Sequence, residues 1–361
     1  MGLFGPKKVS YLGVDLGIGG VKMVELQNEK GRARLVTYGF TERLPDAEPA
    51  NLVDAPRETA ELLKKIMLKA KVTTTKAVTG LPVASVFSSV ITIPKGTDKE
   101  QREAIQWQAK KLIPVPLEEM ILDHKIISTG PAPKGAPAAG KKDEPKSLQV
   151  LITGASKAMV QKYVSVFKAS GLDLVSLETE AFALIRALVG KDRATSMIVD
   201  IGAARTNIII VENGIPYVTR SLDMGGATLT KAMSKTMAMD IKSAEQMKCD
   251  IKSISSIYPG EGLPKMFENV LLPMVTELQY SLNLFTGQTD GPAKTVEKII
   301  ITGGSAILPS LAQYFSSQLN IRAYLGDPWA RVVYSDELRP VIEEIGPRYS
   351  VAVGLAMRDI E

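Results

Sequence analysis

Two stretches of the chain share one pattern of apolar and polar positions. Residues 14–26 (VDLGIGGVKMVEL) and 199–214 (VDIGAARTNIIIVENG) each contain an apolar strand, an aspartate, a glycine-bearing turn and a second apolar strand. The residues after each turn are apolar and β-branched, which favours a strand over the helix that follows the glycine turn of a dinucleotide fold or a P-loop. Asn213-Gly214 is typical of a tight hairpin turn. The pattern therefore predicts two β-hairpins, each with an aspartate beside its turn.

Strand-like and helix-like periods alternate along the rest of the chain, which predicts an α/β fold. The expected strands are 10–14, 21–26, 76–82, 85–94, 148–156, 172–178 and 298–302. The expected helices are 57–70, a polar helix beginning at Asp98, 160–167 with Gly171 closing it, 228–237, 243–248, 264–285, a helix after TGGSAILP, and 349–358. Pro273 is expected to start or kink the helix in which it falls.

The stretch from Gly130 to Pro145 (GPAPKGAPAAGKKDEP) is rich in proline, glycine and alanine. It contains too little apolar surface to offset the entropy of ordering it. We expect a disordered loop there, between two strands of an inserted subdomain.

The helix before Pro114 has Ile105, Ala109 and Leu112 on one face. At 100° per residue Trp107 falls about 200° from Ile105, on the opposite face. Trp107 therefore needs another partner. Two hypotheses stay open: it contacts a bound peptide or another subunit, or it packs on a neighbouring strand of the same subdomain.

Composition narrows the function classes. With 361 residues, 45% hydrophobic and 23% charged, the chain is long enough for two lobes. A single cysteine, Cys249, excludes an intramolecular disulfide and a cysteine-rich zinc site, and a single histidine, His124, leaves little material for histidine catalysis. These counts fit a reducing cytoplasm.

Charge and hydropathy bear on the partners. The formal net charge of +5 comes from 44 basic and 39 acidic residues, so it is a weak argument for nucleic acid and a modest one for an anionic membrane surface. No apolar run is long enough to cross a bilayer, and the N-terminal MGLFGPKKVS lacks the apolar core of a signal peptide. We expect a cytoplasmic protein that binds no nucleic acid and reaches the membrane only through a partner.

The two hairpins, the TGGSAILP turn and their order resemble the actin-like ATPase superfamily, which includes actin, sugar kinases, Hsp70 chaperones and FtsA. The resemblance implies a two-lobed fold with a duplicated mixed-sheet core that binds ATP or ADP with Mg²⁺. It assigns Glu178 to the start of the first connecting helix, and Ala352, Gly354 and Ala356 to the second. The positions that it assigns to nucleotide binding are Asp15, Gly17, Gly19, Gly20, Asp200, Gly202, Thr206, Asn207, Gly226, Glu245, Lys248, Gly303, Gly304 and Ser305.

The chemistry expected of these positions is simple. Asp15 and Asp200 can hold a hydrated Mg²⁺, because this ion prefers oxygen ligands and keeps several waters. The glycines let backbone N–H groups approach phosphate oxygens, and Lys22 can add a positive charge. Glu178 is either a residue that orients the attacking water or an ordinary helix N-terminal charge.

Two departures from the superfamily pattern bear on catalysis. The first loop has Ile18 and Gly19 where many relatives have hydroxyl side chains, and the second has Ala203-Ala204 where glycines are common. Fewer phosphate contacts are therefore expected. The prediction is ATP binding with slow hydrolysis or none.

The segment AIQWQAKKLIPVPLEEMILDHKII and the opening MGLFG resemble the PilM family of type IV pilus assembly proteins. This resemblance implies an FtsA-type inserted subdomain and a groove in the first lobe that holds the cytoplasmic N-terminal peptide of a PilN-like inner-membrane protein. It implies a place at the inner membrane through that partner, with other pilus proteins and self-association as further contacts. The predicted division is lobe 1 at 1–83, the inserted subdomain at 84–172 with its disordered loop at 129–147, lobe 1 again with a connecting helix at 173–195, lobe 2 at 196–340 and a C-terminal connecting helix at 341–361.

Alternative functions remain open from the sequence. The same fold occurs in proteins of type II secretion platforms, in FtsA-like division or filament proteins, and in phosphotransferases of the sugar-kinase type, for which no motif singles out a catalytic aspartate. The chain runs only to AMRDIE after the last predicted helix, so the membrane-targeting tail typical of FtsA is not expected. The pilus scaffold is therefore the preferred hypothesis.

Overall fold

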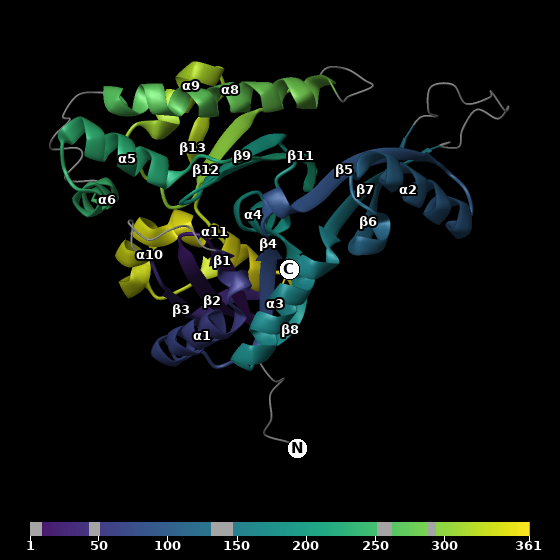
Figure 1. Cartoon of the computed structure of the whole chain (residues 1–361), viewed down its shortest axis with the longest axis horizontal. Coiled ribbons are helices and arrows are strands. Elements are labelled where there is room, and N and C mark those ends of the chain that lie inside the picture. The colour runs from purple at the N-terminus through teal and green to yellow at the C-terminus, as the bar shows by residue number, and fades with distance from the viewer. Residues whose placement is uncertain (1–8, 43–50, 131–146, 251–261, 288–293, 361) are drawn as a thin grey trace. The chain divides into compact units, whose positions relative to one another are not determined.

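The computed structural model describes residues 9–42, 51–130, 147–250, 262–287 and 294–360. Contacts divide the chain into unit 1, residues 1–83 with 163–361, and unit 2, residues 84–162 (Figure 1). The inserted subdomain predicted at 84–172 begins with unit 2, whereas residues 163–172 group with unit 1. Residues 131–146 of the predicted loop lie outside the described residues.

The first sheet of unit 1 has the strand order β14-β3-β2-β1-β4-β8. Its strands are β1 (Ser10–Gly17), β2 (Gly20–Glu29), β3 (Arg32–Phe40), β4 (Lys76–Leu81), β8 (Asp173–Thr179) and β14 (Val332–Val333). The strands β1, β2 and β3 form an antiparallel meander, and the other pairs are parallel. The sequence pattern did not predict β3 or β14.

The second sheet of unit 1 has the order β11-β10-β9-β12-β13. Its strands are β9 (Ser196–Ile201), β10 (Thr206–Glu212), β11 (Ile215–Leu222), β12 (Lys298–Thr302) and β13 (Ala323–Leu325). The hairpin β10–β11 turns at Asn213 and Gly214, which have φ values of 51° and 75°. This is the left-handed pair that a type I′ turn requires, as the Asn-Gly sequence predicted.

The strands of the second sheet are apolar on both faces. Met197, Val199 and Ile201 point into a core beneath α5, α8 and α9, and Ile198 between them points into a core with α4 and α11. Both faces are therefore covered by helices, which explains why these strands are almost uninterrupted apolar runs.

Apart from α10, which the sequence pattern did not predict, the helices that the structure describes in unit 1 lie close to the predicted segments. They are α1 (Pro56–Ala70), α4 (Glu180–Leu188), α5 (Gly226–Met237), α6 (Ile241–Cys249), α8 (Lys265–Gly287), α9 (Leu311–Leu319), α10 (Arg339–Ile345) and α11 (Ser350–Ala356), and α3 (Lys157–Ser170) spans the division between the units. Pro273 lies inside α8 rather than at the start of a helix. None of the helices within the described ranges combines the length and apolar composition needed to cross a bilayer.

The connecting helices α4 and α11 pack at backbone distance. A Cβ added to Gly354 of α11 would lie 1.9 Å from the carbonyl oxygen of Ala183 in α4, and one added to Gly13 of β1 would lie 2.0 Å from that of Ala352. No larger residue fits at either glycine without moving a helix. The run of small residues in α11 thus places this helix directly against β1 and α4.

Unit 2 is a three-stranded antiparallel sheet with one long helix. Its strand order is β5 (Val86–Pro94), β7 (Ser147–Ser156) and β6 (Met120–Gly130), and α2 (Asp98–Leu112) packs on β5. The helix begins with a capping box, in which Thr97 and Glu100 satisfy each other's backbone N–H groups.

The faces of α2 differ in part from the sequence prediction. Ile105 and Ala109 are buried as expected, but Leu112 is 43% exposed and Ile113 takes its place in the core. Trp107 is 57% exposed, and the ammonium of Lys111 lies 3.3 Å from its ring centroid. The hypothesis that Trp107 packs on a neighbouring strand is therefore wrong.

Candidate nucleotide site

The two predicted hairpins are built alike in three dimensions. The register of β1 and β2 places Asp15 opposite Lys22, and that of β9 and β10 places Asp200 opposite Asn207. Asp15 is the third residue from the end of β1, and Asp200 is the second from the end of β9. Both carboxylates therefore lie next to a turn.

The tips of the two hairpin turns meet. A Cβ added to Gly19 would lie 2.7 Å from the Cβ of Ala203, so only glycine allows this approach. Gly20 has a φ of +125°, and a Cβ there would lie 2.0 Å from the carbonyl oxygen of Thr41. The structure therefore brings the two glycine-bearing turns together, although they lie far apart in the sequence.

A third carboxylate, that of Glu180, joins the two aspartates. The side-chain nitrogen of Asn207 lies 3.4 Å from Asp200 Oδ2 and 3.4 Å from Glu180 Oε2, and donates to both. The backbone N–H of Val83 also donates to Glu180 Oε2, with an N–O distance of 3.4 Å. Gly80 leaves room for this side chain, because a Cβ there would lie 3.1 Å from Glu180 Cγ.

The three acids have raised pKa values. Burial raises the pKa of Asp15, and Lys22 opposes the shift. Burial and then the charge of Asp15 raise the pKa of Asp200 to about 6, and burial with the charges of Asp15 and Asp200 raises the pKa of Glu180 to about 8. The ammonium of Lys22 thus faces three carboxyl groups, and the site has a strong electrostatic demand for a further cation.

Within the described ranges, no three His, Cys, Asp or Glu side chains converge closely enough to hold a metal ion directly.

A second group of predicted residues surrounds Lys248. Its buried ammonium donates to the carbonyl oxygen of Gly226 at 3.1 Å, to Thr230 Oγ1 at 2.8 Å and to Glu245 Oε2 at 2.7 Å. Although burial raises the pKa of Glu245, the charge of Lys248 and the hydrogen bonds to the carboxylate outweigh it, and the net shift is downward. A Cβ on Gly226 would lie 2.3 Å from Ser305 Oγ, so the structure brings Glu245, Lys248, Gly226 and Ser305 together.

The glycine turn after β12 joins this group to the hairpins. Thr302 pairs with Asp200 in the parallel register of β12 and β9, so the residues after both strands lie at one edge of the sheet. Gly303 has a φ of +92°, and a Cβ there would lie 2.7 Å from Asp200 Oδ1. A Cβ on Gly304 would meet no described atom within 4 Å, which leaves open space beside this turn.

Two predicted residues are not directed into this site. The carboxylate of Glu178 forms a two-pronged ion pair with Arg186, with both N–O distances 2.8 Å, and the Arg186 guanidinium also donates to the carbonyl oxygen of Gly354 at 2.5 Å. The buried hydroxyl of Thr206 donates to the carbonyl oxygen of Met224 at 2.7 Å. Arg186 thus ties α4 to α11, and Glu178 of β8 holds its guanidinium in place. Glu180, not Glu178, is the carboxylate next to the aspartates.

The sequence pattern did not single out Glu180 or Arg205. Glu180 is the first residue of α4, so the start of the apolar pattern AFALIRAL was the signal that could have found it. Arg205 occupies the hairpin position that corresponds to Gly20 and pairs with Asp223 at 2.8 Å.

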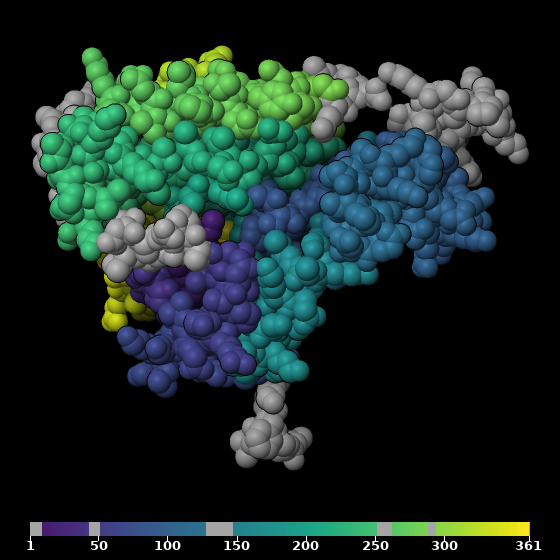
Figure 2. Space-filling view, in the orientation of Figure 1, coloured from purple at the N-terminus to yellow at the C-terminus, as the bar shows by residue number. Residues whose placement is uncertain are grey.

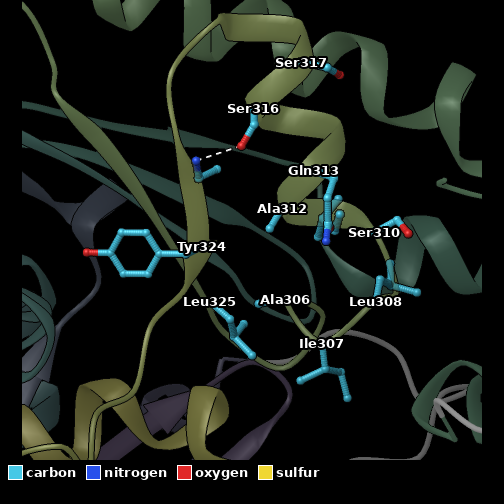
Figure 3. A pocket seen from close by; sticks show the side chains of 12 residues that line it. Ala306, Ile307, Leu308, Ser310, Ala312, Gln313, Ser316, Ser317, Tyr324 and Leu325 are labelled. Atoms are coloured by element: carbon cyan, nitrogen blue, oxygen red, sulfur yellow. Dashed lines mark hydrogen bonds between the residues drawn. The ribbon is translucent and has the colours of Figure 1, made fainter. Parts of the chain in front are cut away.

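A cavity of about 710 Å³ lies elsewhere, between α9, β13 and the segment from Ala306 to Leu308 (Figure 3). Ala312 and Leu325 line it, and Ser316 spans part of it by accepting the backbone N–H of Ala323. Of the residues predicted to bind nucleotide, all of which the structure describes, none lines this cavity.

The two sheets, the paired hairpins and the packed helices α4 and α11 define an actin-like mixed α/β protein. A family model described as type IV pilus assembly protein PilM matches residues 13–360. The chain therefore belongs to the PilM family of type IV pilus assembly proteins, as the inserted segment predicted.

Several solved structures and curated proteins are similar to this chain. A solved PilM-PilN type IV pilus biogenesis complex contains a chain that is 26% identical, with a TM-score of 0.79 over 98% of this chain and 99% of that one. The ethanolamine utilization protein EutJ from Carboxydothermus hydrogenoformans shares the fold, with a TM-score of 0.58 and 16% identity over 98% of this chain and 91% of that one. The cell division protein FtsA of Neisseria meningitidis is 25% identical over 225 residues, 57% of this chain and 52% of that protein. The chain spans about half the length of the curated relatives that it matches.

Proposed function

We propose that this protein is an ATP-binding scaffold of the type IV pilus assembly platform at the inner membrane. The observation that carries the proposal is the similarity over nearly the whole chain to a protein solved in a PilM-PilN complex. The partner would be the cytoplasmic N-terminal peptide of a PilN-like membrane protein, held in a groove of the first lobe. The protein would then lie at the membrane through this partner.

The paired hairpins support nucleotide binding. Asp15 and Asp200 would hold Mg²⁺ through water, and Lys22 would face a phosphate oxygen. The backbone N–H groups of the two turns, at Gly17, Gly19, Gly20 and Gly202, would bind phosphate, because glycine leaves them open to close approach. The cation would also offset the charge that three carboxyl groups place at one site.

The nucleoside would lie toward the second lobe. Glu245 and Lys248 would contact the ribose, and Gly226, Gly303, Gly304 and Ser305 would line the nucleoside. The close packing of Gly226 against Ser305 and Lys248 supports this assignment, because a Cβ at residue 226 would lie 2.3 Å from Ser305 Oγ and 3.1 Å from Lys248 Nζ, so these predicted residues lie together.

Hydrolysis would be slow or absent. Glu180 is better placed than Glu178 to orient a water, but its pKa, raised to about 8, leaves it mostly protonated near neutral pH, which weakens a general base. Glu180→Gln is expected to keep ATP affinity within about threefold while abolishing any turnover. Glu178→Gln should leave ATP affinity and turnover unchanged and should affect only the stability of the fold. Loss of turnover in Glu178→Gln but not in Glu180→Gln would assign the catalytic role to Glu178.

The test of the scaffold is fluorescence anisotropy of a labelled peptide from the cytoplasmic N-terminus of the PilN-like protein of the same organism, titrated with and without Mg-ATP. Saturable binding that changes with ATP is the expected result, and the ratio of the two affinities gives the coupling free energy. Equal peptide affinity with and without Mg-ATP would contradict only the coupling between nucleotide binding and peptide binding. If the peptide does not bind, the proposal that a PilN-like protein is the partner is wrong, and an FtsA-like or phosphotransferase role is favoured.

A further inference from the structure

The strand β6 lies at one edge of the sheet of unit 2, and its side chains are exposed. The strand order is β5-β7-β6, so β7 is the one strand within the described ranges with which β6 pairs. Ile121 and Ile126 are 46% and 50% exposed, and Asp123, His124 and Lys125 between them are exposed as well. Figure 2 shows the surface of unit 2 in blue. An exposed edge strand with apolar side chains is able to pair with a further strand.

The part of β6 that could accept another strand is short. Each residue of β6 up to Ile126 has its own partner in β7, and a bulge follows between Ile126 and Ser128. A bulge bends the strand and interrupts regular pairing. The surface available for pairing is therefore the segment Leu122–Ile126 (LDHKI), which we call the β6 edge.

The β6 edge is complementary to itself when two copies run antiparallel. With His124 of both copies on a two-fold axis, Asp123 of each copy lies opposite Lys125 of the other, and Leu122 lies opposite Ile126. Opposite charges stabilise a cross-strand pair and like charges destabilise it. Of the antiparallel registers centred on a residue of the β6 edge, only this one pairs opposite charges within the edge. A lysine alone on an edge strand opposes pairing, but here the aspartate reverses that effect for a second copy.

The groups that this pairing needs are available in the single chain. The backbone N–H of His124 donates to Asp123 Oδ1 at 2.8 Å in an exposed contact, which indicates that it points toward the free edge rather than toward β7. Lys125 is exposed and forms no ion pair with any side chain that the structure describes. Leu122 packs against the core of unit 2, so Ile126 of a second copy would extend this core.

We propose that two copies of this chain pair through their β6 edges, antiparallel and with His124 on the two-fold axis. The sheets of unit 2 would then form one continuous sheet with three strands from each copy. The contact uses the same surface of both copies and closes on itself, so it yields a dimer rather than an open filament. The bulge after Ile126 keeps the paired segment short.

This inference goes beyond the proposed function, because neither nucleotide nor the PilN-like peptide takes part in the contact. A few residues of paired strand form only a small interface, and the dimer is expected to be weak in dilute solution. A partner that holds several copies at one membrane raises their effective concentration and favours such a contact.

The experiment exchanges the charges across the axis. Sedimentation velocity of the full chain over a concentration series measures the dimer. Asp123→Lys and Lys125→Asp each place like charges opposite one another at both symmetry-related pairs, and each should weaken the dimer roughly tenfold or more. A mixture of the two single variants should associate again, because each supplies the charge that the other lacks. Both substitutions in one chain should also restore the dimer.

Several outcomes would overturn the proposal. These are a parent chain that stays monomeric, single variants that associate as the parent does, and a mixture that does not recover. Both residues are exposed, so the single variants should keep the parent's midpoint in urea denaturation. If the chain stays monomeric and Lys125→Asp weakens binding of the PilN-like peptide, the β6 edge accepts a peptide and the proposal is wrong.

Cross-linking tests the position of the axis. In a Cys249→Ser background, His124→Cys brings two thiols together on the axis and should give an intermolecular disulfide under mild oxidation. Val175→Cys is the matched control, because Val175 is 44% exposed on β8, an edge strand of the first sheet of unit 1. It should cross-link at least about tenfold more slowly. Equal rates at the two positions would mean random collision and would overturn the proposal.

Discussion

The two hairpins of unit 1 share a backbone plan and differ in charge. Asp15 faces the ammonium of Lys22, whereas Asp200 faces the neutral amide of Asn207. Two residues before each aspartate, the first hairpin has Gly13 against the backbone of α11, and the second has Ile198 in an apolar core. One hairpin therefore supplies the cation and the close backbone contact, and the other supplies an amide and side-chain packing.

This difference shows how a repeated element can serve one site. Two identical lysine-bearing hairpins would neutralise their own aspartates and leave little demand for a bound cation. With Lys22 on one hairpin and Asn207 on the other, a single ammonium faces the carboxyl groups of Asp15, Asp200 and Glu180, and the pKa values of all three remain raised. The asymmetry between the hairpins thus supports a Mg²⁺-nucleotide more directly than their similarity does.

The largest expected effect is a loss of stability when the close backbone contact of the first hairpin is disturbed, compared with the same position in the second hairpin. Gly13→Ala places a Cβ against the Ala352 carbonyl oxygen and should lower the free energy of unfolding by about 3 kcal/mol or more. Ile198→Val, at the corresponding position, removes one buried methylene and should cost about 1 kcal/mol. Urea denaturation of both variants measures the difference. Equal costs would mean that α11 can move away from β1.

The next effect concerns Glu180, the carboxyl group of α4 that lies close to the aspartates of both hairpins. The pKa of Glu180 is raised in the folded state, so the folded protein holds its proton more tightly than the unfolded chain. The resulting destabilisation is absent below about pH 4.5, where both states are protonated, grows as the pH rises between the two pKa values, and is complete above about pH 8. Glu180→Gln removes it and should stabilise the protein by on the order of 2 kcal/mol at pH 8 and by little at pH 4.

Denaturation at several pH values checks the sign of this effect. Glu178→Gln is the control, because it breaks the ion pair with Arg186 and should destabilise the protein at pH 8. If Glu180→Gln were less stable than the parent at pH 8, Glu180 would be ionised and paired in the folded protein.

A smaller effect tests the charge difference between the hairpins. Lys22→Met removes the ammonium that lowers the pKa of all three acids and should weaken ATP binding roughly tenfold, about 1.4 kcal/mol. Asn207→Leu removes only a neutral dipole and should weaken it about threefold or less. Isothermal titration calorimetry at a slightly alkaline pH compares the two. A larger loss in Asn207→Leu would reverse the roles of the two hairpins.

The smallest effect tests a predicted nucleotide residue. Thr206 of the second hairpin corresponds to Val21 of the first, and its hydroxyl donates to the Met224 carbonyl oxygen. Thr206→Val should cost about 1 kcal/mol of stability and leave ATP affinity unchanged. Weaker ATP binding with unchanged stability would instead support a contact between this hydroxyl and the nucleotide.

Much of the fold follows from local patterns in the sequence. The strands of both hairpins and the Asn213-Gly214 turn are determined by residues a few positions apart, so the pattern predicted them directly. The strand β3 escaped prediction because its sequence RARLVTYGF has only one fully buried residue and thus a weak alternation. The strand β14 has two residues, too few for any period.

The sequence by itself determined the two hairpins, their aspartates and glycines, and the small-residue helix α11. The tertiary structure alone decided that Glu180 rather than Glu178 meets the aspartates, that the hydroxyl of Thr206 is used internally, and that Trp107 faces outward. These outcomes depend on contacts between residues far apart in the chain, such as that of Asn207 with Glu180. A local pattern sets the direction of a side chain relative to its own element, and only the packing of elements against one another sets what that side chain meets.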